Sequence, residues 1–261
     1  ILLRMSRRSA IAPSTRPCTS LASSTAAACV SLLAGCFGGG DDADAVGRRA
    51  LRQQVVPAVL EPARAAQPVA LIKSRVRWTH PINVPDYKFI AANTRLIPKI
   101  TIPGPCALHF RGGDAAVLQS AYKDLDQFWE DTIAAFGQEL NALAAAGCRY
   151  LQLDEVNFTY LCDPKLIQQV RDRGEDPAAL PMAYAGMINA AISNIPADMA
   201  ITMHLCRGNF RSTFIASGGY EPVAELLFNT INVHGYFMEY DSDRAGGFEP
   251  LRFVPKGKQV V

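Results

Sequence analysis

The amino-acid sequence predicts an α/β fold, in the form of a (β/α)8 TIM barrel that is incomplete at both ends of this chain. Apolar, strand-like runs alternate with helical runs from about residue 69 onward, and such spacing forces neighbouring strands to run parallel. Several of these strands end in ionisable residues, which is typical of the functional face of a barrel. The length of 261 residues also fits one large domain.

The elements are predicted in a regular order. The helix over residues 122–147 is the most strongly indicated, because Phe128, Phe136, Leu140 and Leu143 recur at helical spacing and Gly147 can end it. The other helices are expected within residues 81–94, 180–195 and 218–230. Strands are expected within residues 69–80, 98–110, 148–156, 199–206, 232–241 and 257–261.

Residues 1–60 differ in composition from the rest of the chain. Residues 5–40 are rich in Ser, Ala and Arg and contain no acidic residue. Three interpretations remain open: an organelle transit peptide, a secretion signal ending at Cys36, or disordered or mistranslated sequence outside the fold. The catalytic barrel is therefore expected over residues 69–261 only.

Composition argues against several classes of protein. The net charge is +2, and no dense Lys/Arg patch is interleaved with aromatic residues, so no nucleic-acid partner is expected. No apolar run reaches the roughly 18 residues that span a bilayer, so no membrane partner is expected. The seven cysteines have irregular spacing and no CxxC motif, which indicates reduced thiols and a cytoplasmic location.

His204 and Cys206 are the first candidates for chemistry. Residues i and i+2 of a strand share a face, and zinc accepts imidazole and thiolate together, with a carboxylate as a further ligand. Glu239 ends the next strand and is the natural third ligand. The alternative is a buried histidine and cysteine in an ordinary strand. The predicted strand ends carry, in order, His109, Asp154 and Glu155, His204 and Cys206, and Glu239 and Asp241.

Asp154 and Glu155 are adjacent, so only one of them can face the mouth of a barrel. Asp154 shares its face with Gln152 and could hold a substrate ammonium, while a surface pair or a helix cap is the alternative. Arg111, in "HFRGGDAA", could pair with a substrate carboxylate, although a plain tight turn explains the two glycines as well.

Four motifs in order carry a family resemblance: "LQLDE", "MHLCRGNFRST", "GGYEPVAELLF" and "FMEYDSDRAGGFEPLRF". They resemble the C-terminal catalytic barrel of cobalamin-independent methionine synthase, and in particular its short single-barrel relatives. The resemblance covers about residues 70–261 and leaves out the first 60.

The resemblance implies a zinc-dependent methyltransferase that moves a methyl group from 5-methyltetrahydrofolate (polyglutamate) to the thiol of homocysteine, giving methionine. It implies that His204, Cys206 and Glu239 bind Zn²⁺, with a second cysteine expected beyond Val261. It also implies that Asp154 binds the amino group of homocysteine, with Glu155 beside it. The acid that protonates the departing folate nitrogen is not assigned.

Two alternatives stay open at this point. The same barrel could serve another zinc-dependent thiol alkyltransferase, with a different thiol or donor. The chain could also be a truncated remnant without catalysis, because the fourth zinc ligand and part of the expected barrel are missing from it.

Overall fold

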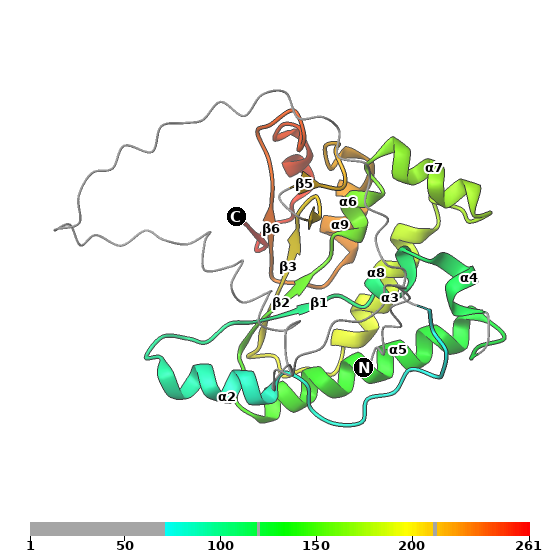
Figure 1. The fold of residues 1–261 in the computed structure, drawn as a ribbon. Coiled ribbons are helices and arrows are strands. Elements are labelled where there is room, and N and C mark those ends of the chain that lie inside the picture. Colours follow the sequence, from blue (N-terminus) through cyan, green and yellow to red (C-terminus); the bar gives the residue numbers. More distant parts are fainter. Residues whose placement is uncertain (1–70, 119–120, 211–212) are drawn as a thin grey trace, which may run out of the picture. The chain divides into compact units, whose positions relative to one another are not determined.

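The computed structural model describes residues 71–118, 121–210 and 213–261, so the predicted atypical segment over residues 1–60 lies outside the described residues. The described chain is built on a parallel sheet with the strand order β1-β2-β3-β6-β7 (Figure 1). A small antiparallel hairpin, β4 (Asn209–Phe210) and β5 (Thr213–Phe214), follows β3. The sheet strands are β1 (Ile100–Pro103), β2 (Tyr150–Asp154), β3 (Ala200–Leu205), β6 (Gly235–Met238) and β7 (Gln259–Val260).

Helices connect the parallel strands, as the alternating sequence pattern predicts. The long helix α5 begins where the Asp124 side chain accepts a hydrogen bond from the Gln127 N–H at 2.9 Å, and it ends just before Gly147, whose φ is +100°. The helices are α2 (Val84–Asn93), α3 (Ala107–Phe110), α4 (Gly113–Val117), α5 (Leu125–Ala145), α6 (Asn157–Tyr160), α7 (Pro164–Asp172), α8 (Leu180–Ile192), α9 (Glu221–Thr230) and the 3₁₀ helix η1 (Glu249–Phe253).

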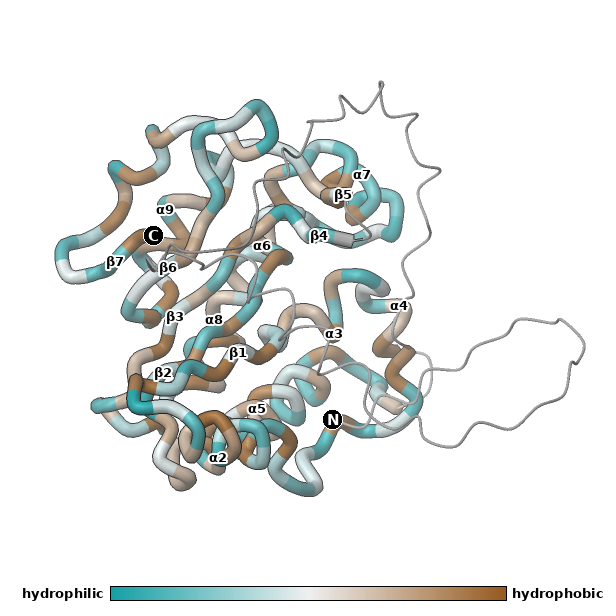
Figure 2. Tube along the Cα trace, turned by 60° about the vertical axis from the view of Figure 1, so that its left-hand side comes forward, coloured by the Kyte–Doolittle hydropathy of each residue, from teal (hydrophilic) through white to brown (hydrophobic). Residues whose placement is uncertain are grey.

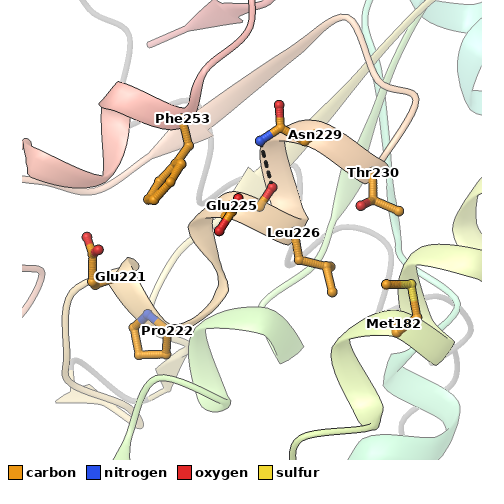
Figure 3. A pocket seen from close by; sticks show the side chains of 8 residues that line it. All are labelled: Met182, Glu221, Pro222, Glu225, Leu226, Asn229, Thr230 and Phe253. Carbon is orange, nitrogen blue, oxygen red and sulfur yellow. Dashed lines mark hydrogen bonds between the residues drawn. The ribbon is translucent and has the colours of Figure 1, made fainter.

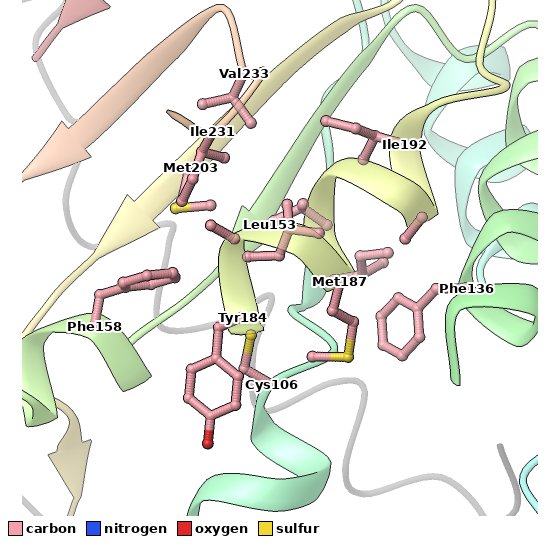
Figure 4. Close-up of a cluster of buried hydrophobic side chains, with 14 of the residues drawn as sticks. Cys106, Phe136, Leu153, Phe158, Tyr184, Met187, Ile192, Met203, Ile231 and Val233 are labelled. Atoms are coloured by element: carbon pink, nitrogen blue, oxygen red, sulfur yellow. The ribbon is translucent and has the colours of Figure 1, made fainter. Parts of the chain in front are cut away.

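The main core lies between one face of the sheet and the helices. Leu151 and Leu153 of β2 and Met203 of β3 are buried on this face. Leu153 and Met203 belong to one apolar cluster with Met187 of α8 and Phe136 of α5 (Figure 4), and Leu151 is part of the same cluster. Polar and apolar residues alternate along β2 and β3 (Figure 2), and this alternation leaves the second face of the sheet to polar side chains.

The second face of the sheet is concave. Lys99, directly before β1, places its Nζ 3.9 Å from the centroid of the Phe237 ring on β6. Strands β2 and β3 lie between them, and in a flat sheet three strand spacings amount to about 14 Å. The sheet therefore curls toward this face, as the wall of a barrel does.

The expected barrel is present only in part. The parallel α/β arrangement is confirmed, but the sheet in the described residues is open and has β1 and β7 at its edges. Among the same residues, no helix has both the length and the apolar composition required to cross a bilayer.

The strand predicted over residues 69–80 is wrong where the structure describes it, because residues 71–80 form no strand. Backbone donors of this segment have partners outside the sheet. The N–H of Ile72 donates to the carbonyl of Ala116 at 3.1 Å, and the N–H of Val76 donates to the Tyr122 hydroxyl at 2.6 Å.

Glu139 of α5 holds the next part of the chain. Its carboxylate accepts hydrogen bonds from the Trp78 indole N–H at 2.7 Å and from the backbone N–H groups of Ile82 and Asn83 at 2.9 and 2.7 Å.

His109 is not at a strand end either. The strand predicted within residues 98–110 stops at Pro103, and the chain continues into the short helices α3 and α4. Proline lacks the N–H that would continue the ladder, so His109 lies one layer outside the sheet, fully buried in α3.

Candidate active site

The concave face gathers polar groups at the carboxyl end of β2. Gln152 donates a hydrogen bond from Nε2 to Oδ1 of Asp154 at 2.7 Å, which confirms that the two side chains share a face. Burial raises the pKa of Asp154, while the hydrogen bond from Gln152 and the nearby His204 and Lys99 oppose that rise. Asp154 thus faces the concavity, near the His204 imidazole and the Lys99 ammonium.

His204 and Cys206 lie on the same face as Asp154. The β2–β3 register pairs Asp154 with His204, and Cys206 follows two residues later. Burial raises the pKa of the Cys206 thiol, and the nearby Glu239 and Asp154 raise it further. The predicted residues of β2, β3 and β6 therefore come together at one edge of the sheet, because parallel strands bring their carboxyl ends there.

Glu239 follows β6 and completes this group. Its Oε1 accepts a hydrogen bond from Arg244 at 2.9 Å. Its Oε2 is buried and has no hydrogen-bond partner among the described residues. A buried carboxylate oxygen without a partner is costly, so this atom is available for a ligand.

A buried layer behind the site holds the ends of β3 and β6 together. The Tyr220 hydroxyl donates to the carbonyl of Leu205 at 2.7 Å and accepts from the N–H of Glu239 at 2.9 Å. The guanidinium of Arg207 lies 4.1 Å from the centre of the Tyr220 ring and is fully buried. Arg207 therefore supports the site from behind.

Glu155 turns away from the concave face. Its carboxylate accepts hydrogen bonds from the Cys106 N–H at 3.1 Å and from Asn157 Nδ2 at 2.8 Å, and it is fully buried. Burial raises the pKa of Glu155 to about 7. A side chain added at Gly104 would collide with this carboxylate. Glu155 thus positions the loop after β1. Of the two adjacent carboxylates, only Asp154 faces the concave side of the sheet.

His204, Cys206 and Glu239 fit zinc in chemical type, because imidazole, thiolate and carboxylate are its usual protein ligands. The unpartnered Oε2 of Glu239 is consistent with this. The three ligand atoms do not all lie within 4.8 Å of one another in the described structure. Binding a metal therefore requires at least one of these three side chains to move.

A second cluster, His109, Asp114 and Glu175, does have its ligand atoms within 4.8 Å of one another. These atoms already have partners, however. His109 Nε2 lies 2.8 Å from Asp114 Oδ1, and the Arg173 guanidinium contacts both oxygens of Glu175 at 2.9 and 3.0 Å. An arginine already supplies the positive charge that a cation would bring, so this cluster is better explained as an ion-pair network.

Tyr160 and Arg111 complete the surroundings of Cys206. The Tyr160 hydroxyl is buried, close to Cys206 and directly beside Gly208. No signal in the sequence marks Tyr160 or Lys99 as part of the site, since each reaches it through folding from a different element. The only signal for Arg111 was its place in "HFRGGDAA", which a plain tight turn explains as well.

A cavity of about 570 Å³ lies elsewhere, between α8, α9 and η1. Figure 3 shows Glu221, Leu226 and Phe253 around it, with Met182 on the neighbouring helix. None of the predicted site residues lines this cavity, so it does not contribute to the candidate active site.

The chain is similar to proteins of known sequence and structure. It is 46% identical over 180 residues to the uncharacterized protein YxjH of Bacillus subtilis, covering 67% of this chain and 46% of YxjH. The uncharacterized protein YxjG of the same bacterium is 42% identical over 180 residues, covering 68% of this chain and 47% of YxjG. No protein-family model matches the chain.

The chain is also similar to a protein of solved structure. A Listeria monocytogenes protein, provisionally assigned as a vitamin-B12-independent methionine synthase, superposes with a TM-score of 0.57 and 34% identity. The match covers 74% of this chain and 54% of that protein. The chain thus spans about half the length of each of these three proteins. Its structural likeness is to proteins of the methionine synthase type.

Proposed function

We propose that the chain carries the catalytic site of a cobalamin-independent methionine synthase-like enzyme, which transfers a methyl group from 5-methyltetrahydrofolate to homocysteine. One observation carries the proposal: the carboxyl ends of three adjacent parallel strands bring together His204, Cys206, Glu239 and Asp154. Within the described part of the chain, Glu239 Oε2 is buried there without a hydrogen-bond partner. The likeness to the Listeria protein supports the same class.

The residues have distinct roles in this proposal. His204, Cys206 and Glu239 hold Zn²⁺, which when bound favours the thiolate form of the homocysteine sulfur. Asp154 accepts the substrate ammonium and so orients the sulfur. In the reaction the S–CH3 bond forms as the N5–CH3 bond of the folate breaks, the thiol proton is lost, and N5 gains a proton. Gln152 keeps the Asp154 carboxylate turned toward the concavity.

The concave face is partly apolar. Phe237 and Tyr150 line its floor and cover the Lys99 ammonium, whose Nζ lies 4.9 Å from the centroid of the Tyr150 ring. Burial lowers the pKa of Lys99, and Asp154 opposes that change. Apolar walls around a few charged groups strengthen the attraction between Asp154 and a bound ammonium.

The first test is the zinc content of the purified 261-residue chain. About one zinc per chain is expected, with little in His204→Ala and Cys206→Ser. Cys162→Ser is the control, because Cys162 is another free cysteine that lies outside the group, and its substitution should leave the zinc content unchanged. Zinc retained in Cys206→Ser, or lost in His109→Ala instead, would refute the assignment.

The second test concerns the substrate. Asp154→Asn should retain zinc but bind homocysteine more weakly, by about 2 kcal/mol for a lost charge-assisted hydrogen bond. Calorimetric titration of homocysteine into both proteins measures this difference. An unchanged affinity would remove Asp154 from the site and leave the metal assignment intact.

A further inference from the structure

The Tyr160 hydroxyl is an anomaly in the described structure. Tyr160 is only 2% exposed, yet its hydroxyl has no hydrogen-bond partner among the described residues. Its ring is held firmly, 5.3 Å from the centroid of the Phe110 ring. A buried hydroxyl without a partner is destabilising, so this hydroxyl is available for a hydrogen bond to a ligand.

Arg111 lies next to this hydroxyl. It caps the end of α3, is exposed, and makes no ion pair with an acidic side chain in the described part of the chain. Burial raises the pKa of Tyr160, and the charge of Arg111 and its contact with the hydroxyl oppose that rise. This contact does not have the geometry of a hydrogen bond. A guanidinium without an acidic partner and a buried hydroxyl without a hydrogen bond thus lie side by side among the described residues.

The pair belongs to the edge of the candidate active site. Gly208 has a φ of +72°, its N–H points at Cys206 Sγ at 3.4 Å, and a side chain there would collide with the Tyr160 hydroxyl. The hydroxyl therefore lies beside the chain segment that carries the sulfur. Arg111 reaches the same place from the loop after β1.

We propose that Arg111 and Tyr160 form an anion subsite of the candidate active site, which holds a carboxylate of one of the two substrates. A guanidinium and a hydroxyl donor together match two oxygens of one carboxylate. Both proposed substrates carry carboxylates: homocysteine on its α-carbon, and the folate on its glutamate tail. The inference rests on the proposed function for the identity of these ligands.

Calorimetric titration of the full chain tests the subsite without relying on turnover. The proteins are wild type, Arg111→Gln, Tyr160→Phe and the control Arg95→Gln, an exposed arginine before β1. Each is titrated with homocysteine and with 5-methyltetrahydrofolate triglutamate. Both site variants should bind one of these ligands about tenfold more weakly, and the control should match wild type.

Two carboxylate-free probes identify the source of the anion. If homocysteine supplies it, the variants should bind 3-aminopropane-1-thiol as well as wild type does. If the folate tail supplies it, they should bind 5-methyltetrahydropterin, which lacks the tail, equally well. Tyr160→Phe should also keep or raise the melting temperature, because only an unpaired hydroxyl is removed.

Three results would overturn the subsite. These are unchanged affinities for both ligands in both variants, no measurable binding of either ligand by wild type at millimolar concentration, or a lower melting temperature in Tyr160→Phe. A chain without zinc whose variants still lose folate affinity would contradict the metal assignment and support the subsite. The two proposals can therefore fail separately.

Discussion

Gly208→Ala is the substitution whose cost the structure defines most sharply. Gly208 has a φ of +72°, and a non-glycine residue in this left-handed region costs about 1 to 2 kcal/mol. The added Cβ would also lie 3.0 Å from Ile215 Cδ1 and would collide with the Tyr160 hydroxyl. Such overpacking costs about 1 to 3 kcal/mol more. We expect Gly208→Ala to lower the free energy of unfolding by about 2 to 5 kcal/mol in total.

The two contributions can be separated. Gly174 has a φ of +82°, and a Cβ added there would have no atom within 4 Å, so Gly174→Ala should show the backbone strain alone. In a Tyr160→Phe background the colliding oxygen is gone, and Gly208→Ala should cost about 1 kcal/mol less than it does in wild type. Urea denaturation of the four proteins of this double-mutant cycle gives the coupling energy.

The result that would refute this reasoning is a cost that stays the same in both backgrounds. It would mean that the Tyr160 hydroxyl does not lie against Gly208, and the anion subsite would then lose its geometric basis. A cost no larger than that of Gly174→Ala would lead to the same conclusion.

Two buried carboxylates should give opposite pH dependences of stability. Burial raises the pKa of Glu155 to about 7. Its contribution to the free energy of unfolding, about 3 kcal/mol, is therefore fully present below about pH 4 and is lost as the pH rises through 7. Denaturation of wild type and Glu155→Gln from pH 5 to 8 should show this slope only in wild type, with the exposed Glu225→Gln as control. For Glu139, burial alone would raise the pKa, but hydrogen bonds from Trp78, Asn83 and Ile82 together outweigh it and lower the pKa. The contribution of Glu139 to the free energy of unfolding is therefore present at neutral pH and is lost as the pH falls through that lowered pKa. Glu139→Gln should cost about 2 to 4 kcal/mol at pH 7, and a cost below about 1 kcal/mol would contradict these bonds.

Much of the fold was predictable because it depends on short-range pattern. The helical spacing of Phe128, Phe136 and Leu140 and the stop at Gly147 predicted α5 closely. The alternating runs predicted the parallel strands β2 and β3. Residues 71–80 were not predictable in this way, since the backbone N–H of Val76 finds its partner in the hydroxyl of Tyr122, 46 residues away.

The candidate site, like the fold, was predictable from the sequence only in part. That His204 and Cys206 share a face, and that Asp154 and Glu155 do not, follows from the two-residue period of a strand. The sequence by itself therefore determined the strand-end residues and their faces. The sequence did not indicate how deeply each of these side chains is buried. Only the structure showed that Glu155 is buried and that its pKa is raised.

The tertiary structure alone decided which distant groups meet. Lys99 reaches Phe237 because the sheet curls, and the Tyr160 hydroxyl comes to lie beside Gly208 because α6 folds over the end of β3. The same packing leaves Arg111 beside that hydroxyl. Contacts between elements depend on the curvature of the sheet and on the packing of loops, and these are properties of the whole chain that no local pattern of residues encodes.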